Sequence, residues 1–271
     1  MTPPTFEDIV AAREFIAPYL PKTPLVRIAK LSEELDCDYY AKLENLQPTG
    51  AFKVRGGVNL VGHEVSPTRV SGWTNHASNA SERPTLVSAS TGNHGQSIAY
   101  AGKLFDARVI IYAPTENVNE SKMQAMRELG AEVRLHGRDF DEARLECERV
   151  ARAEGFRYVH SANEPKLIAG VGTIGLEIFE DLPDVDVIIA PAGGGSCASG
   201  NCIVANRVNP RVRVIAVQSE AAPAMWHAWR NRTLDAYPTM KTEHEGLATR
   251  VPFELTNKTL WELLDDFVTV T

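Results

Sequence analysis

The sequence predicts an α/β protein whose sheets are built from parallel strands. From Thr85 onward, short runs rich in valine, isoleucine and leucine alternate with longer runs that mix apolar and polar residues as covering helices do. The chain has 271 residues, 44% hydrophobic and 23% charged, which is enough for a sizeable core in one large domain or two small ones. In such folds, ligands collect at the carboxyl ends of the strands. The loops that follow strands should therefore carry the chemistry.

The N-terminal part is expected to bring Lys53 to the start of a helix. Thr5 can cap the first helix, whose first turn is acidic. Pro48 and Gly50 interrupt regular structure immediately before the helix that contains Lys53. The expected elements are helices over residues 5–16, 31–35 and 51–61 and a strand over residues 38–43. Lys53 then lies at a strand-to-helix junction.

The remaining chain is expected to alternate between strands and helices. The strands are expected over residues 85–89, 108–113, 132–136, 157–159, 185–190, 211–218 and 265–271. The helices are expected over residues 95–105, 119–129, 140–154, 165–181 and 200–208. Residues 63–84, which include Trp73, form a polar stretch that we interpret as an ordered surface loop.

Composition excludes several classes of function. The net charge of −7 argues against a general nucleic-acid or anionic-membrane surface. No apolar run approaches the length of about 20 residues that a membrane helix needs, and the N-terminus lacks the features of a signal peptide, so a cytoplasmic protein is expected. The cysteines are scattered, and Cys197 with Cys202 lacks the further ligands of a zinc site. We therefore expect free thiols and no metal.

Lys53 is a candidate for imine chemistry. Most lysines are solvated surface residues. An amine in the first turn of a helix, with Arg55 two residues on, meets positive potential that disfavours its protonation, and partial burial lowers its pKa in the same direction.

Two strand-to-helix loops offer groups that bind anions. The first, Ser-Ala-Ser-Thr-Gly-Asn-His-Gly over residues 88–95, combines hydroxyls and a glycine at a helix start, although such turns are often only caps. The second, Pro-Ala-Gly-Gly-Gly-Ser-Cys over residues 191–197, follows an apolar strand. Its consecutive glycines let backbone amides close around phosphate oxygens, the alternative being a tight turn without a ligand.

Several segments together resemble a known family. Thr-Gly-Ala-Phe-Lys-Val-Arg-Gly at residues 49–56 resembles the Schiff-base lysine motif of the fold-type II pyridoxal-phosphate enzymes, in the serine/threonine dehydratase branch that includes threonine ammonia-lyases and serine racemases. The loops at residues 88–95 and 191–197, Ala-Gly-Val-Gly-Thr at residues 169–173 and Glu-Gly-Leu-Ala at residues 245–248 are similar to further family motifs. The resemblance runs from Thr23 to Thr271.

The sequence departs from the family pattern at several places. Ser196 stands where a fourth glycine is common, and Val171 replaces the usual glutamine. The segment after Gln218 lacks the acidic pair that binds a divalent cation in racemases of the family, so no metal is predicted. Family members usually continue for some tens of residues beyond the equivalent of Thr271, and that part faces the pyridine nitrogen. The chain is therefore interpreted as a fragment or a shortened relative.

The resemblance implies a role for each site residue, with pyridoxal 5'-phosphate as cofactor. Lys53 is the catalytic residue, which carries the cofactor and moves the α-proton. His94 could also look like a general base, but the resemblance makes it a structural or carboxylate-binding residue. The residues implied to contact the cofactor are Phe52, Lys53, Asn93, Gly193, Gly194, Gly195, Ser196, Cys197 and Gly246. Those implied to contact the substrate are Ser90, Thr91, Gly92, His94 and Glu245, the last of which is otherwise a solvated loop carboxylate.

The resemblance also implies the architecture and the reaction. The fold is that of tryptophan synthase β-like enzymes, with a large lobe from residues 1–45 and 139–271, a smaller lobe from residues 46–138 and the cofactor between them. The implied enzyme is an ammonia-lyase that converts L-serine or L-threonine to a 2-oxo acid through an aminoacrylate or aminocrotonate, and it is a homo-oligomer, either a dimer or a tetramer. The alternatives are a serine racemase, for which Thr91 is informative, a cysteine synthase-like β-replacement enzyme, and a truncated non-catalytic homologue.

Overall fold

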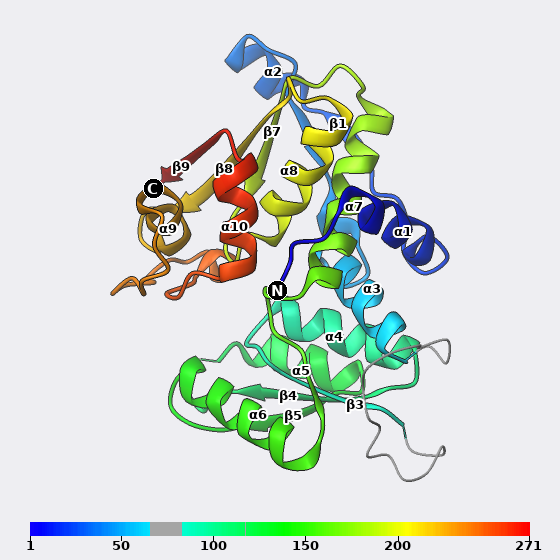
Figure 1. Cartoon of the computed structure of the whole chain (residues 1–271), viewed down its shortest axis with the longest axis vertical. Coiled ribbons are helices and arrows are strands. Elements are labelled where there is room, and N and C mark those ends of the chain that lie inside the picture. The colour runs from blue at the N-terminus through cyan, green and yellow to red at the C-terminus, as the bar shows by residue number, and fades with distance from the viewer. Residues whose placement is uncertain (66–82, 117) are drawn as a thin grey trace.

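The structure is a computed structural model, and it describes residues 1–65, 83–116 and 118–271, with the side chain of Glu245 also outside the described part. Most of the predicted surface loop over residues 63–84, including Trp73, therefore lies outside the described residues. Two α/β parts lie one above the other in Figure 1, with helices α3 and α7 running between them. This is the α/β architecture with parallel sheets that the sequence predicts.

The N-terminal elements lead to Lys53 as expected. Thr5 and Asp8 form a reciprocal capping box at the start of the first helix. Two short strands then pair antiparallel, and helix α3 begins at Lys53. The elements of this part are α1 (Phe6–Ile16), β1 (Leu25–Arg27), α2 (Ala29–Leu35), β2 (Tyr40–Lys42), the 3-10 helix η1 (Glu44–Leu46) and α3 (Lys53–Val65).

The lower part in Figure 1 is a parallel sheet with helices on both faces. Within the described residues its strand order is β5-β4-β3-β6. Successive residues of β3 enter different cores: Leu86 packs with residues of α3, α4 and α5, and Val87 packs with residues of α6. The elements are β3 (Thr85–Ala89), α4 (Asn93–Leu104), β4 (Arg108–Ala113), α5 (Glu120–Glu128), β5 (Glu132–Leu135), α6 (Phe140–Glu154) and β6 (Arg157–Tyr158).

The upper part is a second parallel sheet, with order β7-β8-β9 in the described residues. One face packs on a core to which α1, α7, α8, α9 and α10 contribute. The other face is partly open, since Val187, Ile189, Val268 and Val270 are exposed. The elements are α7 (Pro165–Asp181), β7 (Val187–Pro191), α8 (Ser196–Val208), β8 (Arg213–Ser219), α9 (Ala224–Asn231), the 3-10 helix η2 (Glu245–Leu247), α10 (Glu254–Leu263) and β9 (Asp266–Val270).

Helix α3 joins the two parts through close backbone contacts. A Cβ on Gly56 would lie 2.7 Å from the carbonyl oxygen of Leu167 in α7, and one on Gly170 would lie 2.5 Å from that of Arg55. A Cβ on Gly57 would lie 2.6 Å from the carbonyl oxygen of Ser97 in α4. These glycines let α3 cross α7 and α4 at short range, which fixes its position relative to both parts.

The division into lobes stays a prediction, and one boundary of it is best moved. The pairing of β6 with β3 places Arg157 and Tyr158 in the lower sheet, which favours ending the smaller lobe after β6 and not at residue 138.

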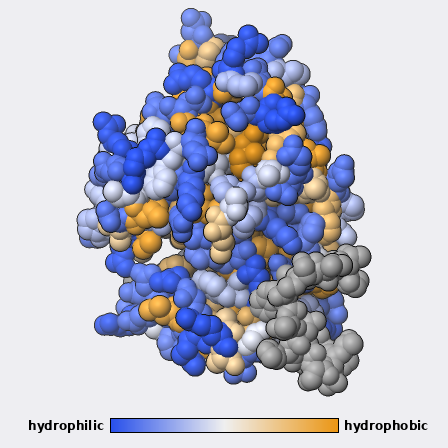
Figure 2. Space-filling view, viewed as in Figure 1, coloured by the Kyte–Doolittle hydropathy of each residue, from blue (hydrophilic) through white to orange (hydrophobic). Residues whose placement is uncertain are grey.

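None of the helices in the described ranges is long and apolar enough to cross a membrane. Hydrophilic side chains cover most of the face in Figure 2, and the outline is hollowed at its left edge between the two parts.

Candidate active site

Lys53 is the first residue of α3, and its amine is enclosed by protein atoms. The residue as a whole is half-buried, and Nζ lies 5.6 Å from the centroid of the Phe52 ring. Burial lowers the pKa of Lys53, and the neighbouring Cys197 opposes that shift. Among the described residues, no carboxylate or carbonyl group accepts a hydrogen bond from this amine. Burial therefore favours the neutral form of this amine, with its lone pair free, more than solvent exposure would.

Arg55 does not act on Lys53 in the way that the sequence suggests. Its guanidinium is 1% exposed and pairs with both Glu44 and Glu177, so that two carboxylates compensate its charge. The lowered pKa of Lys53 comes from burial, and Arg55 is not among its causes. The expectation that Arg55 adds positive potential at Lys53 is therefore wrong.

The loop between β3 and α4 is shaped by Ser90. Its Oγ accepts hydrogen bonds from the amides of Gly92 and Gly95, at 3.1 and 2.9 Å. Thr91, Gly92 and the first residue of α4, Asn93, are half-buried. The Ser90 hydroxyl is thus occupied by the loop itself, while the next three residues remain accessible for a ligand.

His94 is buried and neutral. Burial, followed by the charges of Lys53 and His160, lowers the pKa of His94 to about 3. Ser88 Oγ lies 2.9 Å from His94 Nε2 and donates its own hydrogen to the carbonyl oxygen of Val159 at 2.7 Å. Since that hydroxyl has only one hydrogen, His94 Nε2 must be the donor, which leaves Nδ1 as the unprotonated nitrogen. This position suits a structural role and not a general base at neutral pH.

The triple-glycine turn lies between β7 and α8. Gly195 has a φ of +84°, a conformation that favours glycine, and α8 begins after it without a side-chain cap. A Cβ on Gly193 would collide with the carbonyl oxygen of Gly246, so this turn approaches the backbone of η2 closely. The first amides of α8, at Ser196 and Cys197, are therefore donors that no side chain caps.

Cys197 connects the glycine turn to Lys53. It is buried in the first turn of α8, and burial raises the pKa of its thiol to about 12, with the charge of Lys53 acting in the opposite direction. The thiol is therefore neutral and is no thiolate nucleophile. The described residues contain no cluster of histidine, cysteine and acidic side chains that could hold a metal ion.

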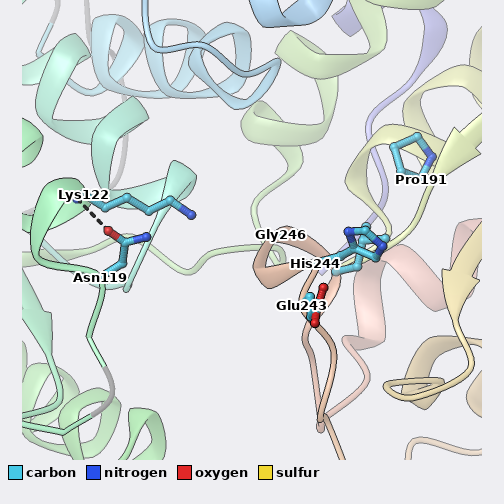
Figure 3. A pocket seen from close by; sticks show the side chains of 7 residues that line it. Asn119, Lys122, Pro191, Glu243, His244 and Gly246 are labelled. Atoms are coloured by element: carbon cyan, nitrogen blue, oxygen red, sulfur yellow. Dashed lines mark hydrogen bonds between the residues drawn. The ribbon is translucent and has the colours of Figure 1, made fainter.

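An open cleft of about 450 Å³ lies between the two parts. Figure 3 shows Lys122 extending from the start of α5 toward the loop that carries Glu243, His244 and Gly246. The Nζ of Lys122 lies 3.7 Å from the position that a Cβ on Gly92 would occupy. Four lining residues, Asn119, Lys122, Glu243 and His244, lie outside every motif that the sequence offered, whereas Pro191 begins the glycine-rich segment. The lining residues are Asn119, Lys122, Pro191, Glu243, His244, Gly246 and Leu247.

The structure brings most of the predicted site residues together. Lys53 interacts electrostatically with both Cys197 and His94, so α3, α8 and α4 begin near one point. Phe52 packs against the core cluster that contains Cys197, and Gly193 meets Gly246. Glu245 is the first residue of η2, but its side chain lies outside the described part of the structure.

Comparison with known proteins identifies the family. The family model for pyridoxal-phosphate dependent enzymes matches residues 16–271. The chain belongs to this family. It is 38% identical over 270 residues to an L-threonine ammonia-lyase of Thermotoga maritima, covering 98% of this chain and 63% of that protein. It is 34% identical over 265 residues to a catabolic L-threonine dehydratase of Staphylococcus aureus, covering 97% of this chain and 72% of that protein.

Solved structures agree on the fold. Maize serine racemase superposes with a TM-score of 0.88 at 26% identity, covering 98% of this chain and 77% of that one. A threonine deaminase from Solanum lycopersicum gives a TM-score of 0.85 at 27% identity, covering 100% of this chain and 76% of that one. This chain therefore spans less than two thirds of the Thermotoga relative and about three quarters of these solved structures.

The site fits the cofactor that the family name specifies. The Lys53 amine is enclosed and has no hydrogen-bond partner within the part of the chain that the structure describes, which suits reaction with an aldehyde. The uncapped start of α8 after Gly195 suits a phosphate group. Pyridoxal phosphate carries both groups, and the Lys53–Cys197 interaction places the amine beside the start of α8.

Proposed function

We propose that the chain carries the site of an ammonia-lyase that dehydrates L-threonine or L-serine to a 2-oxo acid and ammonia. The relatives named L-threonine ammonia-lyase and L-threonine dehydratase, at 38% and 34% identity over nearly the whole chain, support this reaction class. The single observation that carries it is the enclosed Lys53 amine beside the first turn of α8, near His94 of the α4 loop.

In this proposal each structural element has one task. Bound pyridoxal phosphate supplies an electron sink that stabilises negative charge at the α-carbon of an amino acid. Lys53 Nζ would hold the cofactor in the resting site and, once the substrate amine has taken its place, the released amine would accept the α-proton, a role that its lowered pKa favours. The amides at Ser196 and Cys197 bind the phosphate, and Ser90, Thr91, Gly92 and His94 line the site of the substrate carboxylate.

The remaining site assignments are also proposals. Phe52 packs beside the cofactor ring, because its own ring lies 5.6 Å from Lys53 Nζ. Asn93 is half-buried at the start of α4, where its side chain can reach the ring hydroxyl of the cofactor. Gly246 gives backbone room beside Gly193, and Glu245 next to it is assigned to the substrate amine or hydroxyl.

The test is release of a 2-oxo acid. The purified chain, supplied with pyridoxal phosphate, should form 2-oxobutanoate from L-threonine or pyruvate from L-serine, with an equal amount of ammonia. Lys53→Ala is the matched control and should form neither product. A folded chain that binds the cofactor yet releases no 2-oxo acid from either substrate would contradict the proposal and would support a non-catalytic homologue.

Racemisation of serine is the second candidate. It is favoured by the TM-score of 0.88 with maize serine racemase and by Thr91, a hydroxyl residue in the half-buried part of the α4 loop. The hydroxyl of Thr91 would supply a proton on the face opposite Lys53. Formation of D-serine that is lost in Thr91→Ala, while 2-oxo acid release persists, would establish this side activity.

We also propose a cytoplasmic location and a homo-oligomer, either a dimer or a tetramer. The acidic composition and the reduced cysteines that the sequence predicts support the location. Sedimentation of the purified chain at several concentrations measures the oligomeric state.

A further inference from the structure

A buried charge cluster surrounds Arg55, two residues after Lys53. Its Nε and Nη2 donate to the two carboxylate oxygens of Glu44 at 2.8 and 2.7 Å. Its Nη1 and Nη2 donate to the two oxygens of Glu177 at 2.7 and 2.8 Å. The guanidinium is 1% exposed and makes forked bonds to both carboxylates, a geometry that only arginine provides.

The cluster is balanced in charge. Lys42 Nζ lies 2.7 Å from Glu177 Oε2, so two cations face the two carboxylates. Thr23 Oγ1 donates to Glu44 at 2.5 Å, and Thr173 Oγ1 accepts from Arg55 at 3.1 Å. Burial alone would raise the pKa of Glu177, but hydrogen bonds from Arg55 and Lys42 outweigh it and lower that pKa. The Glu177 carboxylate is thus available to hold Arg55.

The cluster connects the first turn of α3 to several other elements. Glu44 belongs to η1, Lys42 to β2, and Glu177 to α7. The backbone crossing of Gly56 and Gly170 lies directly beside it. Residues two positions apart on a helix point to different sides, about 200° apart at 3.6 residues per turn. Holding Arg55 against α7 therefore turns Lys53 away from α7, toward Cys197 and His94.

We propose that Arg55 is the positioning residue of Lys53: its paired guanidinium fixes the rotation of α3 and keeps the charge beside the amine balanced. The proposal depends on the proposed function only in taking Lys53 as the reactive amine. The residues of the charge cluster lie outside the cleft, and the experiment that tests their role uses no substrate.

The groups that face Lys53 make its protonation sensitive to this balance. Cys197 from α8 and His94 from α4 are both neutral at pH 7, since burial raises the pKa of Cys197 to about 12 and lowers that of His94 to about 3. The charges of Glu44 and Arg55 reach as far as Cys197, where they act in opposite directions on its thiol. Removing the charge of either Arg55 or Glu44 therefore leaves an uncompensated charge in the cluster, two residues from Lys53.

The test measures the protonation of Lys53 directly. The chain, freed of cofactor, is labelled with acetic anhydride across a range of pH, and the Lys53 peptide is quantified by mass spectrometry. Arg55→Met leaves the cluster with a net charge of about −1, which favours the charged amine, so the labelling midpoint should rise by about one pH unit. Labelling at a fixed pH below the midpoint should fall about tenfold.

Two further variants complete the cycle. Glu44→Gln keeps the size of the side chain but leaves a net charge of about +1, so the labelling midpoint should fall. Arg55→Lys restores the charge and should return the midpoint toward that of the wild type. Arg13→Met is the matched control, because it removes an ion pair between α1 and α7 at the surface, 3.0 Å from Glu180, and should leave the midpoint unchanged.

The opposite shifts of Arg55→Met and Glu44→Gln support the proposal. Folded variants whose melting temperatures fall while their Lys53 midpoints equal that of the wild type would overturn it, since Arg55 would then serve stability alone. Where Arg55→Met does not fold, the isosteric Glu44→Gln decides in the same way. No substrate is present, so a failure of the dehydratase proposal leaves this result unaffected.

Discussion

The start of α3 and the segment around η2 form opposite sides of the candidate site, and they are held very differently. The residue before Lys53, Phe52, packs against the core of the upper part. Arg55, two residues after Lys53, is held by two carboxylates. The next two residues, Gly56 and Gly57, contact the backbones of α7 and α4. Around η2, Glu243 and His244 are exposed and line the open cleft. A Cβ on Gly246 would meet no atom within 4 Å.

This difference in packing matches two different structural requirements. A residue that must present an amine in one orientation is fixed by several independent contacts. A segment that admits and releases a small molecule needs open space and few contacts. We therefore expect substitutions at the start of α3 to affect chemistry or folding strongly, and substitutions around η2 to affect mainly substrate preference.

The largest effect is expected from Lys53→Ala. Loss of the amine would remove the residue that we propose to hold the cofactor and move the proton, so 2-oxo acid release should fall by a factor of about 10³ or more. His244→Ala, on the other side of the cleft, should retain kcat within about threefold. Comparable losses in the two variants would break the distinction between the two sides.

The second effect concerns the glycine contacts. Gly170→Ala would place a methyl group 2.5 Å from the carbonyl oxygen of Arg55, and we expect it to lower the free energy of unfolding by about 1–3 kcal/mol or more. Gly246→Ala meets open space and should change that free energy by less than about 0.5 kcal/mol. Urea unfolding measures both, and equal destabilisation would contradict the geometry.

The third effect is a pH dependence of stability from His94. Its pKa is about 3 in the folded chain against an ordinary value of 6.5, so the unfolded chain binds more protons between pH 3 and pH 6.5. Stability should therefore fall as the pH is lowered from 6.5 toward 3, by on the order of a few kcal/mol from this residue. His94→Gln should remove that part of the dependence of the unfolding free energy on pH. An unchanged dependence would show that His94 binds a proton as readily in the folded chain as in the unfolded chain.

The smallest effect is expected from Glu243→Gln at the cleft. This carboxylate is exposed, and replacing it with the neutral amide should leave the melting temperature unchanged within about one degree. KM for an amino acid substrate should change by less than about fivefold, with kcat unaffected. A loss of kcat would show that the cleft wall takes part in the chemistry.

Clear capping signals explain which elements the sequence predicted well. The observed bounds of α6 and α7 equal the predicted ones, because Asp139 caps α6 at its start, Gly155 ends it in the left-handed conformation and Pro165 begins α7. Helices α9 and α10 were not predicted from the sequence. Their N-cap residues, Pro223 and Phe253, make no side-chain hydrogen bond that would mark a helix start.

The same contrast holds within the site. The lysine segment and the two strand-to-helix loops could be located from the sequence because each combines characteristic residues within a short stretch. The pairing of Arg55 with Glu177 could not, since the two residues are 122 positions apart and meet only where α3 crosses α7. Local sequence predicts which amine reacts, and tertiary packing determines how that amine is held.

Borohydride reduction of the chain with bound pyridoxal phosphate tests the central claim most directly. Reduction makes the link between the cofactor and its lysine permanent, and peptide mapping then identifies the labelled residue. We expect one pyridoxyl group per chain, on the peptide that contains Lys53, and none in Lys53→Ala. A label on any other lysine, or no label in a folded chain saturated with cofactor, would contradict the account.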